Sequence, residues 1–224
     1  MNFISHYYLD GEDGNPYYNF GLILPDLMSI QKRGWKVTDS DHLSSISEYD
    51  IQILKGVLQH YELDALFHQS NFFTKHTKYI KSLFKVTQIE TERNRKHFLS
   101  HILLELVIDR VIIKNEEHIL DLFYKDLDQV DIIKIGELFH REDPELIKSF
   151  CNFFDKFRSK RYLYKYTSNE AIIFVLNKVL ERVGLPIFNE VQILEKLDES
   201  ITITEQYIDN HYDSIWALRN PLKE

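Results

Sequence analysis

Histidine and carboxylate residues recur at four-residue spacing in two stretches of this sequence. The two rows are His60, Asp64 and His68 and, further along the chain, His97, His101, Glu105 and Asp109. Side chains four residues apart lie on one slowly drifting face of a helix. Imidazole nitrogens and carboxylate oxygens that project from two facing helices are a ligand set for a divalent metal ion. The spacing therefore points to metal chemistry, provided that both stretches are helical.

Both rows begin at the edge of an apolar stripe and run into it. On a helical wheel, Asp64 lies ~60° and His68 ~20° from Tyr61. Glu105 and Asp109 lie at the same two angles from Ile102. A charged group directed at a core is costly unless it is paired or bound to a metal. The structural alternative is that each histidine is half-buried with one hydrogen bond, while the carboxylates form ion pairs. The candidate ion pairs are Glu105 with Arg110, and Asp64 with Lys75 or Lys78.

The elements that must carry these rows are predicted to be helices. Apolar residues repeat at three and four throughout the chain, and the 7 glycines and 5 prolines are too few for a turn-rich all-β fold. We expect one all-α domain over 1–224, a compact multi-helix fold with a long polar loop at 29–47. The expected helices are 2–9, 17–29, 47–69, 71–84, 88–113, 116–124, 128–139, 144–159, 168–183, 187–196 and 202–217.

Local signals set several of the expected helix ends. Thr-x-x-Glu strings, which can cap a helix, begin at Thr87, Thr167 and Thr202. Asp143 followed by proline is typical of a helix start, and Gly184 of a helix stop.

Composition excludes several classes of function. The chain has 27 basic and 35 acidic residues, a net charge of −8, whereas a general nucleic-acid binder is usually basic. A single cysteine rules out a disulfide framework and a cysteine-cluster zinc site. We find no glycine-rich nucleotide-binding string, no apolar run long enough for a membrane span and no signal peptide. The expectation is a cytoplasmic protein that binds neither nucleic acid nor membranes, and the oligomeric state is not readable.

Two more segments complete a resemblance to a known family. The opening Met-Asn-Phe-Ile-Ser-His, which ends at His6, resembles the Met-Asn-Phe-Leu-Ala-His of acyl carrier protein phosphodiesterases. The stretch from Gly21 through Asp26 resembles their Gly-Asn-Leu-x-x-Asp-Phe. The stretch from Gly56 through His60 and Asp64 resembles their Gly-x-x-Leu-His-x-x-Ile-Asp. The late segments through Glu105 and Asp109, and from Tyr166 to Arg182, follow in the same order.

The resemblance implies a helical fold related to the HD-type metal phosphohydrolases. It implies a divalent ion, Mn²⁺ or Mg²⁺, and cleavage of the phosphodiester that joins 4′-phosphopantetheine to a serine of holo-acyl carrier protein. The residues expected to hold the ion are His6, Asp26, His60, Asp64 and His101. The residues expected to orient the attacking water or to protonate the leaving oxygen are Glu105, Asp109 and His68.

The chain also departs from the family pattern. It has His68, Ser70 and Arg110 where the family has aspartate, histidine and histidine, and no His-Asp dipeptide occurs. His68 and His101 could supply replacement nitrogens. Two alternatives therefore stay open: a non-catalytic helical interaction module on the same scaffold, and a metal hydrolase of a different phosphoester.

An acidic carrier protein would need a local basic surface on an acidic enzyme. Three basic runs could provide it or could be solvated helix faces. The runs are Lys75, Lys78, Lys81 and Lys85; Arg93, Arg95 and Lys96; and Lys156, Arg158, Lys160, Arg161 and Lys165.

Overall fold

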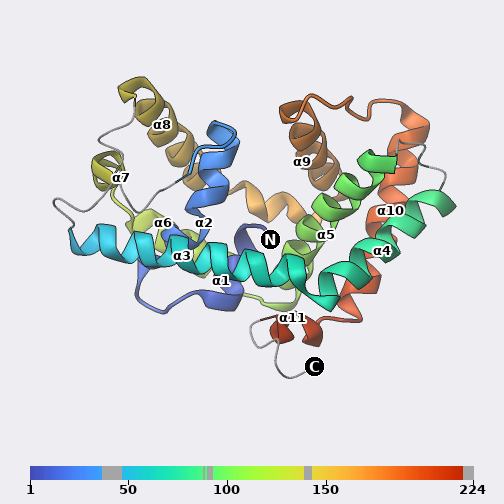
Figure 1. Ribbon diagram of the computed structural model, residues 1–224, viewed down its shortest axis with the longest axis horizontal. Helices are drawn as coiled ribbons and strands as arrows, with labels where there is room; N and C mark the ends of the chain where they lie inside the picture. The colour runs from blue at the N-terminus through green and yellow to red at the C-terminus, as the bar shows by residue number, and fades with distance from the viewer. Residues whose placement is uncertain (37–46, 88, 90–92, 139–142, 219–224) are drawn as a thin grey trace. The chain divides into compact units, whose positions relative to one another are not determined.

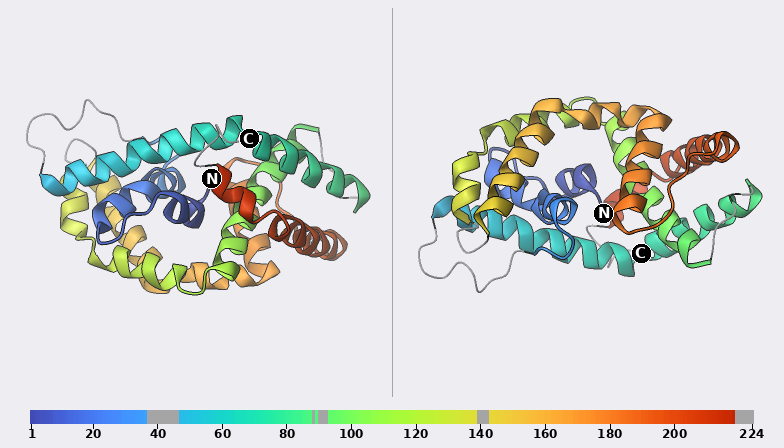
Figure 2. Two further views of the ribbon diagram at one scale, coloured as in Figure 1. Left: turned by 90° about the horizontal axis from the view of Figure 1, so that it is seen from below. Right: turned by 90° about the horizontal axis from the view of Figure 1, so that it is seen from above.

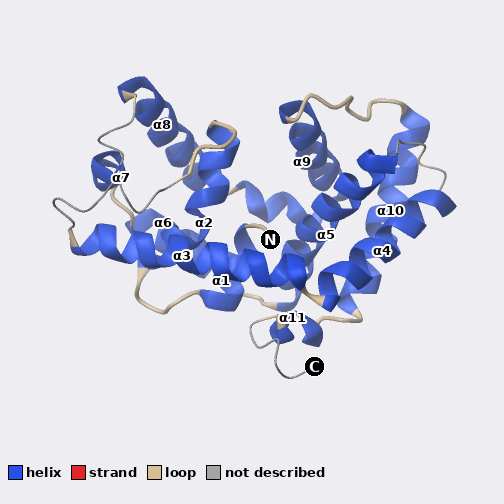
Figure 3. Cartoon of the chain, in the orientation of Figure 1, coloured by secondary structure: helices blue, strands red, loops and turns tan. Residues whose placement is uncertain are grey.

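A computed structural model of the chain describes residues 1–36, 47–87, 89, 93–138 and 143–218. Every regular element in these ranges is a helix, as Figure 3 shows, which confirms the all-α prediction. None of the described helices is both long and apolar enough to cross a membrane. The chain divides into two compact units, and the prediction of one domain over 1–224 stays a prediction.

Unit 1 comprises Met1–Asp64 and His118–Tyr162. Its helices are α1 (Phe3–Asp10), α2 (Pro16–Gln31), α3 (Glu48–Gln69) as far as Asp64, α6 (Ile119–Gln129), α7 (Ile132–Leu138) and α8 (Pro144–Lys160). In Figures 1 and 2, α1 and α2 lie side by side, and both pack on α6. Aromatic rings fill the core between these helices. Phe20 on α2 lies 4.9 Å from Phe154 on α8, measured between ring centroids.

Unit 2 comprises Ala65–Glu117 and Leu163–Glu224, the last six residues of which lie outside the described ranges. It holds the last turn of α3, α4 (Asn71–Val86), α5 (Arg93–Asn115), most of the 3₁₀ helix η2 (Tyr162–Thr167), α9 (Asn169–Arg182), α10 (Val191–Asp209) and α11 (Asp213–Ala217). Helix α5 packs against α4, α9 and α10, and its Leu103, Val107 and Val111 are fully buried. The Tyr79 ring on α4 stacks on Tyr207 of α10, with centroids 3.6 Å apart.

Two of the expected helix ends are confirmed. The backbone N–H of Glu145 donates to the Asp143 carboxylate at 2.9 Å, with Pro144 in the first turn of α8. Gly184 adopts a φ of 73° after α9, a left-handed conformation that glycine takes without steric cost. The Leu185 N–H then donates to the Leu180 carbonyl at 2.9 Å, which closes the helix end.

The expected helices 187–196 and 202–217 are wrong, because α10 is continuous from Val191 to Asp209 and only the short α11 follows. The intervening residues contain no glycine or proline, and Leu197, Ile201 and Ile208 continue one buried face. Thr202 caps nothing. Its hydroxyl donates to the Asp198 carbonyl one turn back at 3.0 Å.

One further capping assignment is wrong, and another depends on residues outside the described ranges. Ser168 rather than Thr167 caps α9, and the Ser168 hydroxyl accepts a hydrogen bond from the Ala171 N–H at 3.2 Å. Thr167 instead belongs to a 3₁₀ helix, Tyr162–Thr167, which the apolar periodicity did not indicate. Thr87 ends α4, and its hydroxyl donates to the Leu83 carbonyl at 3.0 Å. Its expected partner Glu90 lies outside the described residues. The expected loop at 29–47 begins three residues too early, since α2 runs to Gln31, and 37–46 lies outside the described residues.

Candidate metal sites

Three helices of unit 1 each bring one ligand to the first candidate site. His6 lies on α1, Asp26 on α2 and His60 on α3. Helix α2 starts where Asn15 accepts a hydrogen bond from the Tyr18 N–H at 3.3 Å, with Pro16 in its first turn. These capping interactions fix the start of the helix that carries Asp26.

A pair of glycines lets α2 and α3 approach closely. A Cβ atom on Gly21 would lie 2.2 Å from the Ile53 carbonyl oxygen, and one on Gly56 would lie 2.2 Å from the Tyr18 carbonyl oxygen. No other residue fits at either position without a shift of backbone. His60 lies one turn beyond Gly56, so this close crossing positions its ring beside α2. The sequence pattern includes both glycines but does not predict the crossing. The sequence signal that could have indicated the crossing is that both glycines lie in apolar helical segments of a chain with few glycines.

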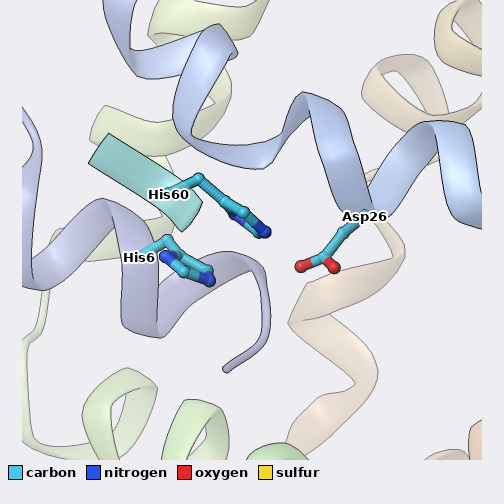
Figure 4. A group of neighbouring side chains, drawn as sticks. All are labelled: His6, Asp26 and His60. Atoms are coloured by element: carbon cyan, nitrogen blue, oxygen red, sulfur yellow. The ribbon is translucent and has the colours of Figure 1, made fainter. Parts of the chain in front are cut away.

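The three side chains converge in the interior of unit 1. One nitrogen from each histidine and one Asp26 oxygen all lie within 4.8 Å of one another. The rings of His6 and His60 are stacked, with centroids 4.0 Å apart and planes at 24°. His6 is fully buried and His60 is buried, while Asp26 is half-buried. In Figure 4 the Asp26 carboxylate points toward the two imidazoles.

A backbone contact orients the His60 ring. Its Nδ1 lies 2.8 Å from the Leu22 carbonyl oxygen, which can only accept, so Nδ1 carries the hydrogen and donates. In the neutral ring the second nitrogen, Nε2, then carries the lone pair. A histidine that donates one ring N–H to a carbonyl and offers the other nitrogen is the usual arrangement of a metal ligand in proteins.

A proline precedes Asp26 directly within α2. Pro25 has no N–H for the Gly21 carbonyl, so the hydrogen-bond ladder of the helix is interrupted directly before Asp26.

The negative charge of Asp26 also affects the ionisation of Tyr61. Burial first, and then the negative charge of Asp26, raises the pKa of the Tyr61 phenol. Tyr61 therefore keeps its proton at neutral pH.

A second group lies entirely within unit 2. His68 comes from the last turn of α3, and His101 and Glu105 from α5. The Nε2 atoms of the two histidines are 2.9 Å apart. Glu105 Oε1 lies 2.7 Å from His101 Nε2 and 3.5 Å from His68 Nε2. All three side chains are half-buried.

Two of the expected site residues belong to neither group among the described residues. Asp64 lies 2.5 Å from the Met1 amino nitrogen, so the four-residue step from His60 does not bring its carboxylate into the first group. Asp109 is fully buried on α5, one turn beyond Glu105. The roles assigned from the sequence to Glu105, Asp109 and His68 in catalysis, and to Asp64 and His101 as ligands beside His60, stay predictions.

The alternative ion pair of Glu105 with Arg110 is wrong. The Arg110 guanidinium donates to the Tyr166 carbonyl at 2.5 Å and to the Asn169 side chain at 2.6 Å, and it pairs with Glu205 at 3.2 Å. A five-residue step turns a helix by roughly 140°, so Arg110 and Glu105 point away from each other. Arg110 on α5 therefore binds η2 and α9 and pairs with α10.

The basic runs differ in how far they are neutralised. Arg158 pairs with Asp155 at 3.2 Å, and Arg161 pairs with Asp128. Helix α4 contains no acidic residue and exposes Lys75, Lys78 and Lys85.

The chain has no significant match among protein-family models, curated proteins or solved structures.

Proposed function

We propose that this protein is a divalent-metal-dependent phosphodiester hydrolase whose metal ligands are His6, Asp26 and His60. The observation that carries the proposal is the convergence of these three ligand atoms from three helices. The family resemblance supplies the substrate: holo-acyl carrier protein, from which 4′-phosphopantetheine is released. An HD-type phosphohydrolase-like fold is part of the same proposal.

The donor set fits a divalent ion. Two ligands about 2.1 Å from one ion are at most roughly 4.2 Å apart, so atoms already within 4.8 Å need only small side-chain shifts. Two imidazoles favour Mn²⁺ over Mg²⁺, because Mg²⁺ prefers a full set of oxygen ligands. When bound, such an ion polarises a phosphoryl oxygen and lowers the pKa of a water molecule.

The remaining chemistry belongs to residues of the chain and to the substrate. In the reaction water adds to phosphorus, the bond from phosphorus to the serine oxygen breaks, and the serine oxygen takes a proton. Tyr61 is T-shaped against His60 with ring centroids 5.5 Å apart, and its phenol keeps its proton. It can donate a hydrogen bond to a phosphate oxygen at this site. Asp26 supplies negative charge that holds a cation between itself and the two histidines.

The test is incubation of the purified chain with holo-acyl carrier protein and Mn²⁺, followed by mass spectrometry of the carrier. The expected result is loss of the phosphopantetheine mass by the wild type and by His118→Ala, and no loss by His60→Ala or Asp26→Asn. His118 is a matched control because it is an exposed histidine of the same unit.

Two outcomes separate this proposal from its alternatives. Metal binding without release of phosphopantetheine, together with hydrolysis of another phosphodiester, would favour a metal hydrolase of different substrate range. If no divalent ion binds or raises the melting temperature, the hydrolase proposal fails and a non-catalytic interaction module remains.

A further inference from the structure

We propose that His68, His101 and Glu105 form a second, independent metal site in unit 2, and that its ion is Zn²⁺. In this inference His68 and Glu105 are ligands rather than the catalytic groups expected from the sequence. The site is complete within unit 2, and it does not depend on the function proposed for the first site.

The contacts among the three atoms cannot all be hydrogen bonds. Each Nε2 holds at most one hydrogen, and a nitrogen that holds it cannot accept. If only His101 carries the hydrogen, that hydrogen lies between two acceptors, and the lone pairs of His68 and the ionised Glu105 face each other across 3.5 Å. If only His68 carries it, the lone pairs of His101 and Glu105 face each other across 2.7 Å. If both nitrogens carry one, two donors face each other across 2.9 Å. A cation between the three atoms receives all three lone pairs at once, so it removes the conflict.

The spacing of the atoms is close to that of a tetrahedral zinc site. Ligand atoms about 2.05 Å from Zn²⁺ lie roughly 3.3 Å apart in a tetrahedron. The observed separations are 2.7, 2.9 and 3.5 Å, so shifts of a few tenths of an ångström open the triangle. Two imidazoles and one carboxylate are a common set of zinc ligands, and imidazole favours Zn²⁺ strongly over Mg²⁺.

The two supporting helices already hold the ligands in place. His101 and Glu105 are four residues apart, so they lie on one face of α5. The Phe73 ring on α4 contacts both imidazoles, with centroids 5.0 Å from His68 and 5.0 Å from His101. The Phe73 ring restricts the rotation of the two histidine side chains. The side chains of His68 and His101 remain 31% and 27% exposed, which leaves room for an exchangeable fourth ligand.

Histidine footprinting of the full chain tests the site residue by residue. Diethyl pyrocarbonate modifies imidazole nitrogens that have a free lone pair, and mass spectrometry locates each modified residue. Two equivalents of Zn²⁺, enough to fill both candidate sites, are expected to slow modification of His68 and His101 at least tenfold and to leave His97 unchanged. His97 is a matched control, because it is exposed on α5 one turn before His101. Equal modification of His101 with and without Zn²⁺ would overturn the proposal.

Competition with a chromophoric chelator measures the affinity. Glu105→Gln and His101→Ala are expected to weaken zinc binding at least tenfold, while His97→Ala binds like the wild type. Circular dichroism verifies that each variant is helical, and Glu105→Gln preserves side-chain volume. Unchanged affinity in both ligand variants would contradict the site.

The two metal sites can be tested separately. His60→Ala is expected to lose the proposed hydrolysis but to retain protection of His101 by Zn²⁺. If the hydrolase proposal fails, protection of His101 is still expected, and loss of that protection in His60→Ala would show that the sites are not independent.

Discussion

Gly21 and Gly56 lie against each other where α2 crosses α3, with too little space for a Cβ atom on either. A Cβ atom on Gly56 would lie 2.2 Å from the Tyr18 carbonyl oxygen and 2.9 Å from the Gly21 backbone. The same crossing brings the Leu22 carbonyl to His60 Nδ1 at 2.8 Å. The glycines therefore act on the first candidate metal site through the distance between its two longest helices.

The substitution Gly56→Ala is expected to destabilise the protein, although helix propensity alone favours alanine over glycine by about 1 kcal/mol. The added methyl group has to push two backbones apart, which costs on the order of 1–3 kcal/mol. Chemical denaturation measures the free energy of unfolding, and a Mn²⁺ titration measures the affinity of the first site, which should also fall. Lys55→Ala, an exposed neighbour on α3, is the control. An increase in stability of Gly56→Ala would contradict the close crossing.

The substitution Asp26→Asn is expected to lower the pKa of Tyr61. Burial, the larger cause, still holds this pKa above its usual value, but the contribution of the Asp26 charge is lost. Carbon NMR of the labelled tyrosines resolves the titration of the Tyr61 phenol. A bound diamagnetic divalent ion such as Mg²⁺ should lower the Tyr61 pKa in the wild type but not in Asp26→Asn. The exposed acid Asp121, replaced by asparagine, should leave Tyr61 unaffected. The same pKa in wild type and Asp26→Asn would show that Asp26 does not face Tyr61.

The exposed lysines of α4 are expected to bind the acidic carrier protein if that protein is the substrate. Replacing Lys75, Lys78 and Lys85 together by glutamate should raise KM roughly tenfold at low salt and leave kcat unchanged. The difference should shrink as salt is added, since exposed charges are screened. Charge reversal at Lys148, an exposed lysine on α8, is the control. A change in kcat with KM unaffected would rule out a docking role for this face.

The fold was predictable where it depends on local sequence, and less so where it depends on tertiary contact. Apolar periodicity located most of the helices, and Asp143 and Gly184 marked their ends through interactions within a few residues. Thr202 carries the same local capping signal as a helix start, yet it lies inside α10 because the buried face continues through it. A capping string shows only that a hydroxyl can form a hydrogen bond with the nearby backbone. Here the Thr202 hydroxyl donates that hydrogen bond to the Asp198 carbonyl.

The candidate sites show the same division. Four-residue spacing correctly placed His101 beside Glu105, a contact within one helix. Spacing could not show that His60 would meet His6 rather than share a ligand set with Asp64, because that depends on how three helices cross. The family resemblance named His6 and Asp26 together with His60, and periodicity alone had no means to do so.

The buried histidine His76 makes the stability of the protein depend on pH. Burial first, and then the nearby His211 and Lys75, lower its pKa from 6.5 to about 4. The unfolded chain takes up this proton as pH falls below about 6.5, whereas the folded protein does not until pH 4, so stability is lost across this window. The loss is at most about 3 kcal/mol, and less where solvent screens the charge.

Denaturation of wild type and His76→Phe at pH 7 and pH 4.5 measures this loss of stability, with His97→Phe as the control. His76→Phe should flatten this part of the pH dependence, because phenylalanine keeps the ring between Phe72 and Tyr207 without a titrating group. Parallel pH profiles for wild type and variant would show that His76 is not the responsible group.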